Sequence, residues 1–204
     1  MKLYYTPGAC SLSSHIALRE AGLPFELVKV DFPAKLTEGG EDFLAINPKG
    51  AVPALALDGG GVLTEAAVIA QWIADQAPAK RLAPAAGTME RYRLQEWLNY
   101  IATELHKGFA PLWKQDTPHE YKAIAKQNLA KQFAYLDGRL AQSDYLMADT
   151  FTAADAYAYT ILNWTNFLQI DLKPYANISA YVARVAARPA VRESLKAEGL
   201  LKAA

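Results

Sequence analysis

The stretch Lys2-Leu3-Tyr4-Tyr5-Thr6-Pro7-Gly8-Ala9-Cys10-Ser11 decides how the N-terminal part of the chain folds. Its first four residues are typical of a short strand, which Pro7 and Gly8 then break. A helical pattern follows from Leu12 to Ala21. Cys10, the single cysteine of the chain, therefore lies where a strand passes into a helix. Because the free amides and the dipole of a helix start favour a thiolate, the sequence predicts a reactive thiol here.

Two interpretations of Cys10 stay open from the residues alone. The thiol is either a nucleophile or a small apolar residue that fills the core. Ser13 stands where a redox motif of two cysteines would have its second thiol. Such a site can attack a sulfur or a carbon atom, but it needs an external thiol to release a mixed disulfide.

Length and composition narrow the class of protein. The chain has 204 residues, 52% of them apolar, which suffices for one large or two small domains with a sizeable core. The 21 basic and 21 acidic residues balance, which argues against nucleic-acid binding and against attachment to an anionic membrane. No apolar run approaches the roughly 20 residues that span a bilayer. With no signal peptide pattern and one cysteine, we expect a cytoplasmic protein.

The order of patterns predicts an α+β fold in two parts. In residues 1–77, we expect strands at 2–5 and 24–30 and two more strands in a hairpin. Helices are expected at 12–21 and 64–76, and helical turns at 41–46. Residues 31–40 are expected to form a loop. Such an order fits a small mixed sheet covered by helices.

Residues 78–87 contain two prolines and small residues, and they are interpreted as a linker between domains. Residues 88–204 then form an all-helical domain. We expect a long helix at 88–113 with Thr88 as its N-cap, and others at 119–140, at 152–167, from residue 174 for about a dozen residues, and from 189 to about Lys202. Thr152 and Asp155 nearly match a capping box.

Asn47-Pro48-Lys49-Gly50-Ala51-Val52-Pro53 is the second stretch of interest. Pro53 opens a strand, and it requires an extended Val52 before it. If the bond between them is cis, the backbone of Val52 can pair with an extended peptide ligand. The alternative is an ordinary turn before a strand.

A third stretch is the helix start Thr64-Glu65-Ala66. Thr64 can cap this helix, the amides of Glu65 and Ala66 can receive a carboxylate, and Glu65 can accept an ammonium group. These groups suit an amino-acid head group, although a plain capped helix gives the same pattern.

Asn99, Thr103 and His106 share one polar face of the long helix. This face is either part of a site or a solvated stripe with a lone histidine. No histidine pair and no cysteine–histidine cluster has the spacing of metal ligands, so we expect no metal.

The whole arrangement resembles the cytosolic glutathione transferases over essentially the full chain. Five stretches carry the resemblance: Tyr4–Ser11, Asn47–Ala54, Leu63–Ile69, Glu104–Lys107 and Thr152–Asp155. The combination of Cys10 with His106 resembles the bacterial beta class. The resemblance implies a thioredoxin-like domain at residues 1–77, glutathione as cosubstrate, and a homodimer.

The resemblance also implies roles for individual residues. The Val52–Pro53 bond is expected to be cis, and the Val52 backbone to pair with the cysteinyl part of glutathione. Glu65 and Ala66 are expected at the γ-glutamyl end, where Ala66 replaces a usual serine and leaves only its amide. Lys35 is expected at the glycyl carboxylate.

The remaining implied roles concern the reacting sulfur and the second subunit. Cys10 and His106 are expected at the glutathione sulfur, with Tyr5 and Ser11 as lesser hydroxyl candidates. Asn99, Thr103 and Glu104 are expected to approach glutathione, partly from the neighbouring subunit. Phe109, Trp113 and Trp164 are candidates for the walls of an apolar cleft that holds a small electrophile.

Three functions follow from this pattern. The first is conjugation of the glutathione thiolate to electrophilic, mostly apolar compounds in detoxification. The second is disulfide reduction or reductive dehalogenation through a mixed disulfide on Cys10. The third is a carrier or binding role without catalysis.

Overall fold

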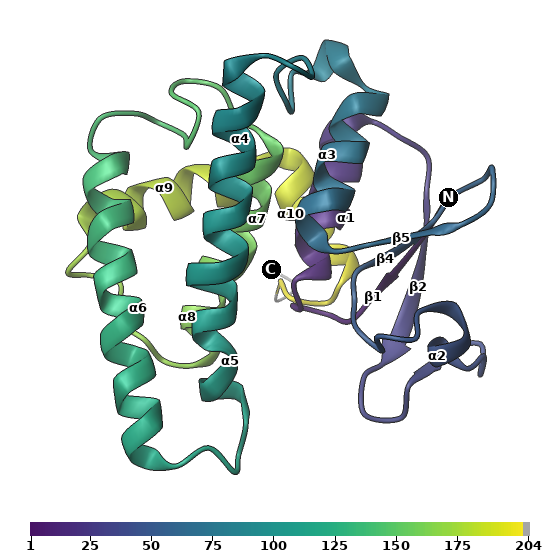
Figure 1. Cartoon of the computed structure of the whole chain (residues 1–204), viewed down its shortest axis with the longest axis horizontal. Coiled ribbons are helices and arrows are strands. Elements are labelled where there is room, and N and C mark those ends of the chain that lie inside the picture. The colour runs from purple at the N-terminus through teal and green to yellow at the C-terminus, as the bar shows by residue number, and fades with distance from the viewer. Residues whose placement is uncertain (202–204) are drawn as a thin grey trace.

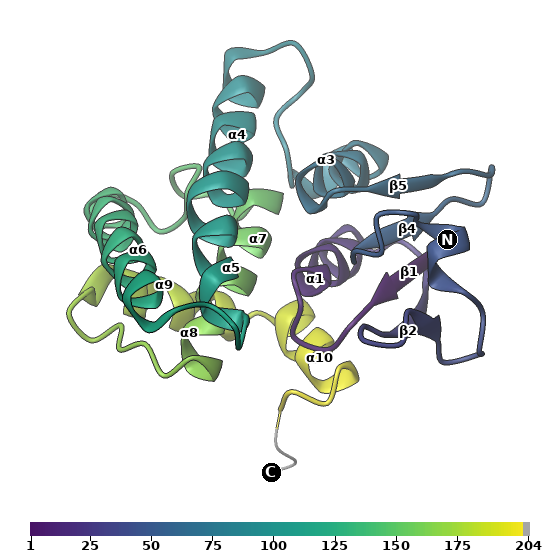
Figure 2. The same cartoon turned by 60° about the horizontal axis from the view of Figure 1, so that its bottom comes forward.

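The computed structural model describes residues 1–201 and has the predicted α+β architecture (Figure 1). A small mixed sheet with its helices forms the N-terminal part, and helices form the C-terminal part. Helices α1 (Ser11–Ala21) and α3 (Ala66–Gln76) pack against each other between the sheet and the C-terminal helices (Figures 1 and 2). No helix within residues 1–201 combines the length and the apolar character that a membrane crossing requires.

The sheet has the strand order β3-β2-β1-β4-β5. Its strands are β1 (Lys2–Tyr5), β2 (Glu26–Asp31), β3 (Leu36–Thr37), β4 (Ala54–Ala56) and β5 (Val62–Thr64). Strands β1 and β2 are parallel, and the other pairs are antiparallel. The prediction of a loop at residues 31–40 missed β3, because a two-residue strand on the edge of a sheet has no period to detect.

Helix α1 begins directly after the turn that follows β1, as predicted. It ends at Gly22, whose φ of 69° is the left-handed conformation that glycine adopts freely. The short helix α2 (Phe43–Ile46) confirms the helical turns expected at residues 41–46. Its Phe43 is fully buried and packs against the ring of Tyr4 in β1, with ring centres 5.8 Å apart. These elements place the β1–α1 turn close to the residues that precede β4, since the Sγ of Cys10 lies 3.1 Å from the carbonyl of Val52.

The C-terminal part contains α4 (Met89–Tyr100), α5 (Lys107–Trp113), α6 (His119–Leu140), α7 (Ala153–Leu162), α8 (Trp164–Phe167), α9 (Ala176–Ala186) and α10 (Pro189–Ala197). Every residue of α7 is buried, and α7 lies at the centre of this part, where it contacts α1, α3, α4 and α9 (Figure 1). The linker is docked as well, since Leu82 is buried and its carbonyl accepts a hydrogen bond from the amide of Ala153 at 2.8 Å.

Two caps were predicted correctly. The Thr88 side chain accepts a hydrogen bond from the amide of Arg91, and Thr152 and Asp155 form the complete capping box. The predicted cap at Thr64 is wrong, because Glu65 is the residue that precedes α3 and no side chain caps this helix. The last helix ends at Ala197, whereas the predicted end at Lys202 lies outside the described residues.

The predicted long helix at 88–113 is not one regular α-helix. A π-helical segment, Ile101–His106, separates α4 from α5. The wider turn of a π-helix changes which side chains face the same way, and such segments are frequent at functional sites. Here Ile101 and Leu105 are fully buried, while His106 at the end of the segment lines the cavity described below.

Candidate active site

A cavity of about 750 Å³ lies between the two parts of the protein. It brings together most of the residues predicted from the sequence: from the N-terminal part Cys10, Val52, Pro53, Glu65 and Ala66, and from the C-terminal part His106, Trp113 and Trp164. Its volume lies within the range of small-molecule sites in proteins. The cavity is therefore the candidate active site.

Other predicted residues do not line this cavity. The Nζ of Lys35 instead donates to the carbonyl of Gly50 at 2.8 Å and lies over the ring of Phe32. Asn99, Thr103 and Glu104 are exposed on the outside of α4 and the π segment, where the hydroxyl of Thr103 donates to Glu104 at 3.1 Å. Their roles stay predictions, because a second chain is needed to test them.

The apolar wall differs in one residue from the prediction. Phe109 is fully buried and packs edge-on behind Trp164, with ring centres 5.7 Å apart, so it supports the wall without lining the cavity. Phe167 takes the third place beside Trp113 and Trp164. Tyr5 and Ser11 are buried and do not line the cavity either.

Cys10 is the residue that precedes α1, and its Sγ donates to the carbonyl of Val52 at 3.1 Å. Burial raises the pKa of the thiol to about 12, and the charge of Glu65 also raises it. The backbone amides of Cys10 and Ser11 and the charge of Lys107 lower the pKa, but they do not outweigh the desolvation. The prediction of a thiolate is thus wrong, because the loss of hydration exceeds the effect of the helix start.

The Val52–Pro53 peptide bond is cis, as the resemblance implied. The turn before it is held by Asn47, whose side-chain amide donates to the carbonyl of Ala51 at 2.7 Å. Val52 and Pro53 line the cavity immediately before β4 begins at Ala54. The extended segment immediately before β4 therefore faces the same space as the Cys10 sulfur.

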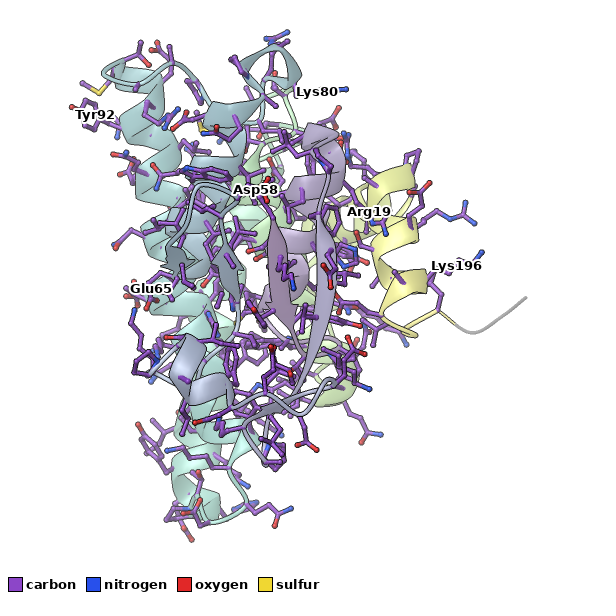
Figure 3. All side chains as sticks on the ribbon, turned by 90° about the vertical axis from the view of Figure 1, so that its right-hand side faces the viewer. Arg19, Asp58, Glu65, Lys80, Tyr92 and Lys196 are labelled. Carbon is purple, nitrogen blue, oxygen red and sulfur yellow. The ribbon has the colours of Figure 1, made fainter. Side chains whose placement is uncertain are left out.

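Glu65 lies at the start of α3 with a φ of 69°, a conformation that L residues rarely adopt. Such backbone strain concentrates at ligand-binding sites. Its carboxylate, at the outer edge of the molecule, accepts from Lys49 Nζ at 2.6 Å (Figure 3). No side chain caps α3, and the amides of Ala66 and Ala67 make no hydrogen bond within residues 1–201, so they can bind an anion.

His106 is held by two aromatic neighbours. Its Nδ1 lies 2.7 Å from the hydroxyl of Tyr157, and its ring centre lies 4.9 Å from that of Trp164. Burial lowers the pKa of His106 to about 4, and the charge of Lys107 lowers it further, whereas Glu65 raises it. The imidazole is therefore neutral at neutral pH and offers one donor and one acceptor.

The turn before Cys10 is fixed by the C-terminal part. The amide of Gly8 donates to Glu198 at 2.9 Å, and the carbonyl of Gly8 accepts from the indole of Trp164 at 2.8 Å. The same Glu198 carboxylate pairs with Nδ1 of the buried His15 at 2.9 Å. The backbone amide and the backbone carbonyl of Gly8 are thus both held by residues more than 150 positions away in the sequence.

Comparison with known proteins identifies the family. The model of the glutathione S-transferase N-terminal domain matches residues 8–76, and that of the C-terminal domain matches residues 100–189. Glutathione S-transferase GstA of Escherichia coli O157:H7 is 48% identical over 200 residues, which cover 98% of this chain and all of that protein. This chain belongs to the glutathione S-transferase family.

Solved transferase structures agree with the fold. A sphingomonad glutathione S-transferase complexed with glutathione superposes with a TM-score of 0.96 and is 49% identical, over 98% of this chain and all of that one. A bacterial beta class transferase from Sphingomonas chungbukensis gives a TM-score of 0.96 at 45% identity, with the same coverage. The resemblance to the beta class is thereby confirmed.

Sequence reasoning missed several residues of this transferase site. Lys49 and Lys107 line the cavity, and both stand in motifs that were recognised for their neighbours. No sequence pattern marks Tyr157 as a site residue. It lies in a helix that is buried on all sides, so the polarity pattern of the helix does not distinguish the face toward the cavity from the others. No sequence pattern marks Glu198 either, since only the tertiary fold brings it to Gly8.

Proposed function

We propose that this protein conjugates the thiolate of glutathione to small electrophilic, mostly apolar compounds and acts in detoxification. The observation that carries the proposal is the shared cavity, where the segment before β4, the uncapped start of α3 and the Cys10 turn face an aromatic wall. One half of this cavity suits an extended, charged peptide, and the other half suits an apolar compound. Glutathione S-transferases that are close relatives support the same conclusion.

The proposed glutathione subsite follows the chemistry of the tripeptide. The backbone of Val52 beside Pro53 pairs with the cysteinyl residue by strand-type hydrogen bonds. The amides at Glu65 and Ala66 receive the γ-glutamyl carboxylate at the start of α3, and the Glu65 carboxylate accepts the ammonium group. Lys49 pairs with that carboxylate, so a bound ammonium would replace one exposed ion pair with another.

The sulfur of glutathione would lie beside Cys10, under His106. The neutral imidazole can donate one hydrogen bond, and the Lys107 ammonium at the cavity wall adds a positive charge. Both favour a bound thiolate, which is the nucleophilic form. Trp113, Trp164 and Phe167 would hold the electrophile in front of it, because aromatic walls bind apolar rings without competing for the sulfur.

A homodimer completes this proposal. Asn99, Thr103 and Glu104 are exposed on one side of the C-terminal part. In a two-fold dimer, these residues of one chain would approach the glutathione bound to the other chain. Lys35 reaches the glycyl carboxylate only if it leaves the Gly50 carbonyl, which costs one partly buried hydrogen bond. A cytoplasmic location belongs to the same proposal.

No metal is part of the proposed chemistry. Within residues 1–201, no group of three or more histidine, cysteine, aspartate or glutamate side chains has the geometry of a metal site. The reaction instead needs only the thiolate, an electrophilic carbon and a leaving group. Glutathione is a cosubstrate in this scheme and is consumed in each turnover.

Turnover of an activated aryl halide tests the proposal. We expect conjugate formation that saturates with glutathione and that an S-alkyl glutathione inhibits competitively. No conjugate above the uncatalysed rate at saturating glutathione would refute it. The variant Trp113→Ala should weaken binding of the aryl halide and leave the KM for glutathione unchanged, since Trp113 stands on the apolar wall.

The mixed-disulfide alternative is not favoured. A thiol whose pKa is raised to about 12 is a poor nucleophile at neutral pH, and the relatives are transferases. The variant Cys10→Ala separates the two reactions. Conjugation by this variant with little loss supports the transferase reaction, whereas a glutathione adduct on Cys10 during turnover would favour the alternative.

A further inference from the structure

Tyr157 lines the candidate active site and contacts His106. It lies in α7, its side chain is 2% exposed, and it lines the cavity. Its hydroxyl contacts Nδ1 of His106 at 2.7 Å, and the two rings meet edge-on at 86°. This is the one hydrogen bond that the hydroxyl makes within residues 1–201.

The direction of this hydrogen bond follows from the two groups. Burial raises the pKa of Tyr157, and the nearby Cys10 sulfur also raises it, so the phenol keeps its proton. A phenol is a good donor and a neutral imidazole nitrogen is a good acceptor. If Nδ1–H donated instead, the phenol proton would have no acceptor within residues 1–201, and a buried unpaired donor costs about 1–3 kcal/mol.

We propose that Tyr157 is a positioning residue that fixes the His106 imidazole in the tautomer with its proton on Nε2. Nδ1 is then the acceptor, and Nε2–H is left as the donor of a side chain that lines the cavity. Nε2 makes no hydrogen bond to any of the residues 1–201, so it is free to donate to a ligand. The inference rests on the proposed function, in which that ligand atom is the glutathione sulfur.

Trp164 restrains the same ring from a second direction. Its ring centre is 4.9 Å from that of His106, and its indole donates to the Gly8 carbonyl in the turn before Cys10. The imidazole is therefore fixed by a hydrogen bond at one nitrogen and by an aromatic contact. A ring held in this way needs little reorganisation when charge develops on the sulfur, which is how preorganised donors favour a reaction.

The variant Tyr157→Phe removes the hydroxyl and keeps the ring. Tyr159→Phe is the matched control, because Tyr159 lies in the same helix, is 3% exposed, and its hydroxyl makes no hydrogen bond within residues 1–201. The first measurement is the ¹⁵N spectrum of the histidine side chains in the protein without glutathione. The chain has three histidines, and His106→Asn assigns the signal of His106.

We expect the Nε2–H tautomer of His106 in the unchanged protein and in Tyr159→Phe, and a shift toward Nδ1–H in Tyr157→Phe. The second measurement is the kinetics of conjugation. We expect kcat to fall about 10-fold in Tyr157→Phe, the effect of about one lost hydrogen bond to a charged sulfur, with a KM for glutathione changed less than about two-fold.

An Nδ1–H tautomer in the unchanged protein would overturn the proposal. So would an unchanged tautomer in Tyr157→Phe, or an equal loss of kcat in Tyr159→Phe, which would indicate a merely structural role. Absence of transferase activity in the unchanged protein would refute the proposed function alone. The histidine spectra need no substrate, so they would still decide how Tyr157 orients His106.

Discussion

Replacement of Asp155 by alanine should be among the most destabilising single changes in this protein. The Asp155 side chain is fully buried and accepts four hydrogen bonds: from the amides of Leu146 and Thr152, at 2.9 and 2.8 Å, and from the hydroxyls of Thr152 and Tyr181, at 2.9 and 3.0 Å. It thereby ties the loop before α7 to α9 as well as capping α7 itself.

The magnitude follows from the donors that lose their acceptor. The two hydroxyls can turn to other acceptors, and Tyr181 already has the backbone carbonyl of residue 155 at 3.3 Å. The two buried amides cannot turn, and each unpaired buried donor costs about 1–3 kcal/mol. Burial raises the pKa of Asp155, so removal of the carboxyl also relieves some desolvation. We expect a net loss of about 3–4 kcal/mol in the free energy of unfolding.

Urea unfolding at pH 7, followed by circular dichroism at one fixed protein concentration, measures this loss. Asp149→Ala is the matched control, because Asp149 is exposed in the same loop and its side chain makes no hydrogen bond within residues 1–201. It should change the free energy of unfolding by less than about 0.5 kcal/mol. A loss below about 1 kcal/mol for Asp155→Ala, at an unchanged dependence on urea, would refute the reasoning.

Three further predictions concern the cavity. With a pKa of about 12, about one Cys10 thiol in 10⁵ is ionised at pH 7. Alkylation of Cys10 by iodoacetamide should therefore be slow, and its rate should still increase above pH 9. A rate that reaches a plateau near pH 8 would contradict this. The pKa of His106 is about 4 when folded and about 6.5 when unfolded, so the unfolded chain binds more protons between these values. The free energy of unfolding should therefore fall as the pH drops from 6.5 to 4, and it should fall less steeply in His106→Asn. The same dependence on pH in both proteins would contradict this. Gly8→Ala should lower the free energy of unfolding by about 1–2 kcal/mol and weaken glutathione binding measured by calorimetry. Gly8 has a φ of +72°, and an added Cβ would lie 3.4 Å from the Phe167 ring. Unchanged stability and affinity would argue against strain at this turn.

The sequence allowed the fold and the position of the site to be predicted where local rules apply. The strand, turn and helix around Cys10, the cap at Thr88 and the capping box at Thr152 each depend on a few neighbouring residues, and all three are present. The protonation of Cys10 was not predictable in this way. It depends on how much water the folded protein excludes from the sulfur, and no local pattern reports that.

The same limit explains the π-helical segment and Tyr157. Residues 88–113 have the period of one helix, yet Gly108 brings the chain so close to α6 that an added Cβ would lie 2.9 Å from Leu129. Such a contact between two packed helices is tertiary, and the period of a single helix does not reveal it. Tyr157 becomes part of the site only because the fold brings α7 to His106, which the sequence of α7 alone does not reveal.

The bonds at Gly8 have a consequence for the order in which this protein is made. The turn that carries the Cys10 thiol is synthesised 190 residues before Glu198, whose carboxylate holds the amide of Gly8. The nascent chain therefore carries an unfinished turn until Glu198 has been synthesised. A chain that stops before residue 198 would contain every cavity-lining residue and still lack the bond that shapes the turn.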